Sequence, residues 1–324
     1  MKALALALLW PAMILSAPES SPWKIDPQPA LAPGLPGSWD DYAIASPSIL
    51  RLPDKLMLFY EGVRFDRDGL YRGGGMAESR DGIAWTKYDQ NPLFLPALKK
   101  IETWSSLSVA RWKEKFWLVT AVNEDPFRRE KQSERFDPVP VFAQLARSDD
   151  GLIWNPVLTA KLPMWSENFF PIRPWLCGDD TGLHLWWIGP VGERDRALFH
   201  SVSRDGETWS RPNQQPVKEI DDREICCARV YPSGSYYLLT YVAKAFDEAR
   251  RRDNYFLVTK TSRNARTWTA SGPPEFLLES HWMHSPPMLL FQPDGVRLFY
   301  SVEEPDDTIA LRSAWCSKSD YVSH

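Results

Sequence analysis

Short apolar runs separated by polar turns recur along the whole chain. In one unit, ASPSILRLPDKLMLFYEGV, two apolar runs flank a short polar turn, and a third run, GGGMAES, follows after a variable loop. The runs are rich in β-branched and aromatic residues and are bounded by Gly, Pro, Asp and Asn, which is typical of β-strands. Similar units precede Trp154, Trp209 and Trp268, and a fifth, MLLFQPDGVRLFYSVEE with TIALRSAWCS, comes last.

Four of these units are followed by the same small motif. Its copies are SRDGIAW, SDDGLIW, SRDGETW and SRNARTW, which end at Trp85, Trp154, Trp209 and Trp268. Ser and Asp side chains bond nearby backbone N–H groups, Gly adopts the conformation of a tight turn, and Trp packs against the sheet. We therefore predict a hairpin that joins the third strand of each sheet to a fourth, weakened in the last copy because Ala265 replaces the glycine.

Four-stranded antiparallel units that recur about every 60 residues predict an all-β, five-bladed β-propeller. The N-terminal segment WKIDPQPALAPGLPGSWDD resembles WTKYDQNPLFLPALKKIETWSS, which follows the first Trp turn. It is therefore expected to add the outer strand that the fifth blade lacks, closing the ring without an exposed edge. One domain over residues 19–324 is predicted, with blades near 39–97, 98–160, 161–215, 216–275 and 276–324, the last joined by strand 23–32.

Composition narrows the class of protein. A net charge of −4 over 324 residues argues against nucleic acid as the main partner. Residues 1–18 have the pattern of a signal peptide, which predicts a secreted or periplasmic protein, and no later apolar stretch is long enough to insert into a membrane. The four cysteines match no zinc spacing, so buried free thiols in strands are expected, in a monomer.

The segments that lead into the innermost strands carry the candidate chemistry. Aligning WDD, WSS, WSE, DRE and WMH puts one residue from each blade at the mouth of the ring: Asp41, Ser106, Glu167, Glu224 and His284. Several carboxylates gathered at one place shift each other's pKa values, which is common where such groups are used.

The first blade resembles a known superfamily. The residues WDD…SPSIL…KLMLFYEG…GGGMAESRDGIAWTKYDQNPLF are similar to those of five-bladed propeller glycosidases, the arabinanase, β-xylosidase and fructosidase relatives of glycoside hydrolase families 43 and 32. The resemblance implies that Asp41 serves as base or nucleophile and Glu167 as proton donor. Such enzymes commonly add a second-blade Asp, whose place is taken here by Ser106, with Glu102 as the nearest carboxylate.

Each candidate also has a structural interpretation. Asp40 and Asp41 would equally cap a turn, and Asp40 is an alternative functional residue. Trp39, Trp104 and Trp165 form either an aromatic floor for sugar or wedges between blades. Glu224 accepts sugar hydroxyls, acts as the acid, or pairs with Arg223 or Arg229.

His284 is either structural, a substrate contact, or a water-mediated support for a calcium ion at the axis, as the resemblance implies for some relatives. No cofactor is expected to be required. The sequence thus favours a secreted glycoside hydrolase that uses paired carboxylates on a poly- or oligosaccharide. A propeller that binds glycan or protein without catalysis is the alternative.

Overall fold

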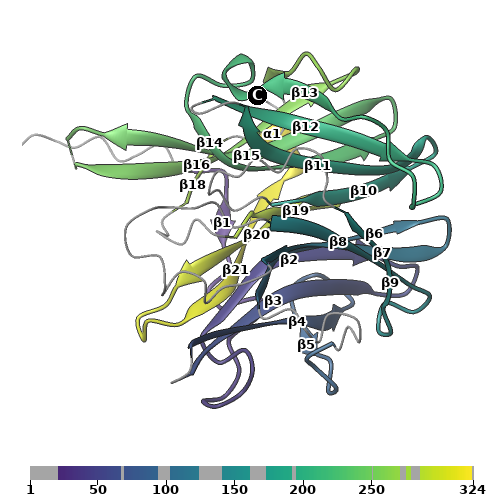
Figure 1. Ribbon diagram of the computed structural model, residues 1–324. Helices are drawn as coiled ribbons and strands as arrows, with labels where there is room; N and C mark the ends of the chain where they lie inside the picture. Colours follow the sequence, from purple (N-terminus) through teal and green to yellow (C-terminus); the bar gives the residue numbers. More distant parts are fainter. Residues whose placement is uncertain are drawn as a thin grey trace, which may run out of the picture.

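The chain forms an all-β, five-bladed propeller (Figure 1). The computed structural model describes residues 21–66, 69–93, 103–123, 141–160, 173–191, 195–249, 251–270, 275–278 and 285–322. The predicted signal peptide lies outside these residues. In Figure 1 the innermost strands β2, β10 and β19 lie near the middle of the molecule, whereas the outer strands β5 and β13 lie toward its edges.

Each blade is an antiparallel sheet whose strands follow in chain order from the axis outward. The first blade contains β2 (Ala43–Arg51), β3 (Leu56–Asp66), β4 (Gly69–Ser79) and β5 (Thr86–Lys87). The second contains β6 (Thr103–Trp112), β7 (Lys115–Asn123), β8 (Val141–Ser148) and β9 (Asn155–Ala160). The third contains β10 (Trp175–Asp179), β11 (Gly182–Val191), β12 (Asp195–Ser203) and β13 (Asn213–Pro216), and a short 3₁₀ helix, η3 (Val217–Glu219), follows it.

The last two blades include the only departures from this order among the described residues. The fourth contains β14 (Glu224–Ser233), β15 (Tyr236–Asp247), β16 (Arg252–Ser262) and β17 (Thr269–Ala270), and β18 (Phe276–Leu278) also pairs with β16. Residues 276–278 thus belong to the fourth blade, not to the fifth as predicted. The fifth contains β19 (Met288–Gln292), β20 (Gly295–Glu303) and β21 (Ile309–Ser317), before helix α1 (Lys318–Val322).

The N-terminal segment supplies the outer strand of the fifth blade, which confirms that prediction. Strand β1 (Lys24–Ile25) pairs antiparallel with β21, and Leu31 forms a further bridge with Leu311. The Asp26 carboxylate bonds Arg297 of β20, so a charge pair anchors the segment as well. Residues from the two ends of the chain therefore share one sheet.

The SxDG turns form as predicted. In the first, Ser79 Oγ accepts a hydrogen bond from Gly82 N at 2.9 Å, and Asp81 Oδ1 accepts from Ile83 N at 2.8 Å. The backbone N–H groups of Ile83 and Ala84, which donate to Asp81, lower the pKa of its carboxyl. Gly82 has φ +77°, and in the last copy Ala265 takes φ 57°, a left-handed conformation that is strained for a residue with a Cβ.

The turns also join each blade to the one before it in the ring. Trp85 of the first blade packs edge-on against Phe299 of the fifth, and Trp154 of the second packs likewise against Phe59 of the first. A Cβ added at Gly206, in the third blade's turn, would lie 1.9 Å from the ring of Trp117 in the second. The repeated motif is therefore a contact between blades as well as a hairpin.

The innermost strands are linked directly by side-chain hydrogen bonds. The junctions are Ser48 Oγ with Val109 N (2.9 Å), Ser108 Oγ with Leu176 N (3.0 Å), Trp175 Nε1 with Val230 O (2.7 Å), Tyr231 OH with Leu289 N (3.3 Å) and Met288 Sδ with Ile49 N (2.9 Å). Taken in order, they run from the first blade to the fifth and back to the first. Backbone groups buried at the axis are satisfied in this way.

A polar cluster with two histidines is buried in the third blade. The His184 and His200 rings stack, with Nδ1 of His184 2.8 Å from Nε2 of His200, and Asp179 Oδ1 lies 3.0 Å from His184 Nε2. His200 also stacks on Trp186, with ring centroids 3.7 Å apart. Burial, reinforced by the charge of His184 and opposed by Asp179, lowers the pKa of His200 from 6.5 to about 3.

The four cysteines are free thiols in strands, as predicted. Cys177 lies in β10, Cys226 and Cys227 in β14, and Cys316 in β21. All but the half-buried Cys226 are buried.

Removing a junction hydroxyl should destabilise the ring. Ser108→Ala leaves the buried N–H of Leu176 without its acceptor, which costs about 1–3 kcal/mol in the free energy of unfolding. Urea denaturation followed by tryptophan fluorescence measures this loss. Ser233→Ala is the matched control, because the described residues provide no hydrogen bond to that half-buried hydroxyl. Equal stability of the two variants would contradict a structural role for the junction.

The buried histidine pair should make the protein sensitive to acid. The unfolded chain binds a proton at His200 near pH 6.5, whereas the folded chain does so only near pH 3. Stability is therefore complete above about pH 6.5 and falls as the pH drops from 6.5 toward 3. His200→Gln should flatten this part of the profile in urea titrations at successive pH values. An unchanged profile in the variant would assign the acid sensitivity to other groups.

Candidate functional site

The innermost strands all begin at one end of the axis, which we call the axial mouth. The register of each blade identifies equivalent positions there, because Ser48 pairs with Phe59 and Ser108 with Val119, each eleven residues later. Ser46 and Ser106 stand two residues before these positions, at matching irregularities of β2 and β6, with φ 50° and 61°. The first-blade equivalent of Ser106 is therefore Ser46, and the predicted alignment with Asp41 was wrong.

The sequence alignment failed because it matched short segments by their residues, whereas equivalent positions are defined by how the strands pair. Asp41 stands seven residues before Ser48, whereas Ser106 stands only two before Ser108. The equivalent positions in the other blades are Arg173, Cys227 and Pro286. The described mouth positions thus contain serine, arginine, cysteine and proline, not a set of carboxylates.

A buried glutamate connects the first two blades at the mouth. Glu61, on β3, is 2% exposed, and its Oε2 accepts hydrogen bonds from Ser46 Oγ at 3.0 Å and from Ser106 N at 3.2 Å. Its other oxygen pairs with Arg72 of β4. Ser285, before β19, extends the network by accepting from Ser46 N at 2.7 Å. One carboxylate therefore fixes the positive-φ residues of two blades.

Arg229 forms the floor beneath the mouth. Its guanidinium donates to Pro47 O at 2.6 Å and to Pro286 O at 2.8 Å, so a β14 side chain reaches the first and fifth blades. It also lies over the ring of Trp175, 4.5 Å from the centroid. Arg229 is 2% exposed, and burial lowers its pKa. This contact differs from the predicted pairing with Glu224.

The third and fourth blades contribute a second cation. Arg173 is 8% exposed, and its Nη1 donates to Cys226 O at 3.2 Å. A register shift in β14 lies between Ile225 and Cys227, so Cys226 pairs with no residue of β15. Burial raises the pKa of the Cys226 and Cys227 thiols, which stay neutral at pH 7.

Asp40 and Asp41, the first-blade candidates, have different surroundings. Asp40 is 2% exposed and bonds Lys87 Nζ at 2.6 Å and Tyr60 OH at 3.2 Å, over β3 and β5 rather than at the axis. Asp41 Oδ2 accepts from Gly37 N at 2.7 Å, and no bond within the described part of the chain reaches its Oδ1. Asp41 thus caps a turn just before β2 and keeps one oxygen open.

Trp39 packs on the first blade. Its ring stacks on Tyr60, with centroids 5.7 Å apart. A Cβ added at Gly62, Gly73 or Gly75 would lie within 3 Å of this ring, so the glycines of β3 and β4 make room for it. This position agrees with packing rather than with an aromatic floor at the axis.

Glu224 lies at the start of β14, half exposed, between Arg196 and Lys244. Both nitrogens are 3.7 Å from its carboxylate, and Lys244 also contacts Asp253 at 3.0 Å. The predicted partner Arg223 bonds Asp221 and Glu275 instead.

The remaining candidates lie outside the described residues, so their roles stay predictions. These are Glu102, Trp165, Glu167 and His284, and of Trp104 only the backbone, in β6, is described. Within the described ranges no group of three His, Cys, Asp or Glu side chains is placed to hold a metal ion, so the predicted axial calcium has no assigned ligands.

Sequence reasoning missed Glu61 and Arg72, which the structure brings to the mouth, and it considered Arg229 only as a partner for a carboxylate. It also missed two aromatic side chains at the β3–β4 hairpin on the same end, Phe65 and Tyr71, which are 58% and 44% exposed. Glu61 itself was available as a signal, because it interrupts the apolar run that opens β3. The contacts themselves join distant segments, which no local pattern reveals.

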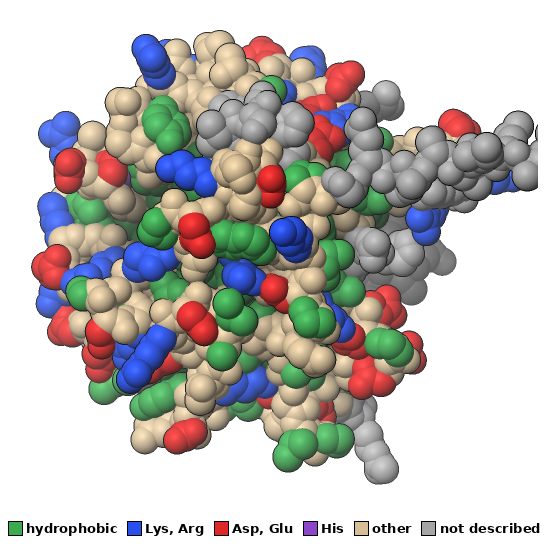
Figure 2. All heavy atoms as spheres, turned by 180° about the vertical axis from the view of Figure 1, so that it is seen from behind, with side chains coloured by type: hydrophobic (Ala, Val, Ile, Leu, Met, Phe, Trp, Pro, Cys, Tyr) green, Lys and Arg blue, Asp and Glu red, His purple; other side chains and the backbone are tan. Residues whose placement is uncertain are grey.

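The molecular surface is mixed in charge. Figure 2 shows basic and acidic side chains interspersed over one face, without a large field of either sign. Within the described ranges, no helix has both the length and the apolar character needed to cross a membrane.

Comparison with known sequences finds a distant relative but no family. No family model matches the sequence. The uncharacterized protein Rv1502 of Mycobacterium tuberculosis (strain ATCC 25618 / H37Rv) is 26% identical over 192 residues, which are 57% of this chain and 60% of that protein. The chain thus matches less than two thirds of this relative.

Solved structures resemble the chain over most of its length. A complex of BT0996 with RGII has a TM-score of 0.63 at 15% identity, and the match covers 90% of this protein and 92% of BT0996. The catalytic domain of the Coprinopsis cinerea GH62 α-L-arabinofuranosidase has a TM-score of 0.61 at 14% identity, covering 92% and 97%. A thermostable family-43 glycoside hydrolase has a TM-score of 0.54 at 14% identity, covering 90% and 91%. The protein therefore shares the five-bladed β-propeller fold of glycoside hydrolases.

Proposed function

We propose that this protein binds carbohydrate at the axial mouth and hydrolyses glycosidic bonds there, as an exported enzyme. The observation that carries the proposal is the gathering of polar and charged side chains where the inner strands begin: Ser46, Ser106, Glu61, Arg72 and Arg173. Buried polar groups at the centre of an apolar ring are costly, and such clusters are common where a ligand uses them. The solved structures that share the fold are described as glycoside hydrolases, which supports a carbohydrate ligand by analogy of fold.

The chemistry follows from paired carboxylates. In this proposal Glu167 protonates the departing oxygen, while Asp41 activates water or attacks the anomeric carbon through an oxocarbenium-like transition state. Asp41 suits this role in two respects: it stands at the mouth end of β2, and its Oδ1 is unbonded by the described residues. The bond from Gly37 N holds the other oxygen and so orients the group.

A glycan-binding propeller without catalysis is the second candidate. It is favoured by the mouth positions of the first two blades, which hold Ser46 and Ser106, and by the pairing of Glu61 with Arg72. Glu61 is poorly placed to act as a base, because Ser46 and Ser106 bond one of its oxygens and Arg72 bonds the other.

Reducing-sugar release from a panel of polysaccharides and aryl glycosides tests the proposal. Glu167→Gln and Asp41→Asn should each lower activity at least about a hundredfold, as expected for loss of a general acid or base. Asp54→Asn is the matched control, because that exposed carboxylate lies in the β2–β3 turn, at the other end of the blade.

Circular dichroism is the control that tests whether each variant is folded. Activity that survives in both folded variants would place the reaction elsewhere. A wild-type protein that binds glycans yet cleaves none of the panel would contradict hydrolysis and establish the binding propeller.

A further inference from the structure

Arg173 is a buried cation without an acidic partner among the described residues. Its Nη1 donates to the carbonyl of Cys226, and its buried Nε has no hydrogen-bond partner there. Among the described residues, the nearby carboxylate of Glu224 faces Arg196 and Lys244 rather than Arg173. A guanidinium taken out of water in this state is unfavourable unless an anion or several acceptors satisfy it.

The surroundings of Arg173 reinforce the excess of positive charge. Arg229, beneath it, donates to backbone carbonyls, and its own Nε is also buried without a partner in the described part of the protein. The one buried carboxylate described at the mouth, Glu61, is already paired with Arg72. The neighbouring thiols of Cys226 and Cys227 are neutral, so Cys227 can accept a weak hydrogen bond from Arg173 but neither thiol supplies a negative charge.

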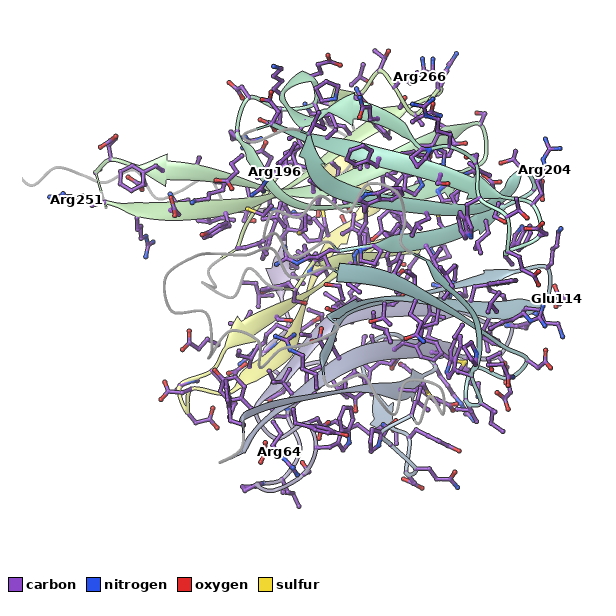
Figure 3. All side chains as sticks on the ribbon, in the orientation of Figure 1. Arg64, Glu114, Arg196, Arg204, Arg251 and Arg266 are labelled. Carbon is purple, nitrogen blue, oxygen red and sulfur yellow. The ribbon has the colours of Figure 1, made fainter. Side chains whose placement is uncertain are left out.

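A third arginine approaches the same bend of β14. Arg196, on β12, donates from Nη1 to Ile225 O at 3.3 Å, next to the carbonyl that Arg173 uses. The Arg196 side chain is 22% exposed, whereas Arg204 and Arg266 lie at the periphery of the molecule in Figure 3. Two guanidinium groups from the third blade thus converge on consecutive residues of the fourth.

We infer that Arg173 binds an acidic group of the carbohydrate, either the carboxylate of a uronic acid or a sulfate ester. This inference rests on the proposed function, because it places the sugar at the axial mouth. A planar guanidinium matches both oxyanions through two parallel N–H···O bonds. Its contacts to β14 hold the fork in place before the ligand arrives, which lowers the ordering cost of binding.

Isothermal titration with matched glycan pairs tests the inference. Each uronate oligosaccharide is compared with its carboxyl-reduced form, and each sulfated oligosaccharide with its desulfated form, so the two arms separate carboxylate from sulfate. The wild-type protein should bind the acidic member of one arm at least about tenfold more tightly, as for a charge-assisted bidentate contact. Arg173→Gln should lose most of this preference, and Arg173→Lys should keep part of it.

Arg204→Gln is the matched control, because that arginine is exposed at the periphery and should leave the preference intact. If Arg173→Gln does not fold, the affinities of the wild-type protein for the acidic and neutral members of each pair still test the inference. Equal affinity for both members of every pair would overturn the inference while leaving carbohydrate binding in place. Binding of neither member would contradict the proposed function as well.

Discussion

The fold depends on satisfying the backbone of five innermost strands that meet around one axis. These strands belong to separate blades, so their buried N–H and C=O groups at the junctions find no partner in their own sheets. Side chains supply the partners: a hydroxyl at Ser48 and Ser108, an indole at Trp175, and a thioether at Met288. Because each junction bridges neighbouring blades, the ring holds its members at fixed positions. Side chains at the axial mouth are therefore held at fixed positions relative to one another.

The same constraint explains why the mouth is polar. The irregularities of β2 and β6 turn Ser46 and Ser106 out of the regular ladder, and Glu61 with Arg72 holds both in place. A buried ion pair stabilises little in net terms, because desolvation offsets much of its attraction. Its value here is positional: it fixes two blades relative to each other where a ligand would enter.

The sequence predicts well that the blades repeat, but it predicts poorly which residues of different blades occupy equivalent positions. The SxDG turns were identified because Ser79, Asp81 and Gly82 act within a few residues of one another. The N-terminal strand was identified because its sequence resembles the segment that follows the first Trp turn. The mouth positions were misaligned because equivalence between Ser46 and Ser106 follows from pairing with β3 and β7, which local similarity to WDD did not reveal. The surroundings of Arg173 could not be predicted, since its lack of an acidic partner among the described residues is a property of the folded state.

The order of the blades allows a binding site for an acidic sugar and a catalytic carboxylate to occupy the same ring. Arg173 enters from the third blade and Asp41 from the first, and the second blade separates them on one side while the fourth and fifth separate them on the other. The anion of the ligand would therefore sit on the cationic side, away from Asp41. Repulsion between two charges falls with distance, and Arg173 and Arg229 would screen what remains. The arginines would thus offset the repulsion between a negatively charged substrate and a carboxylate site in the same ring.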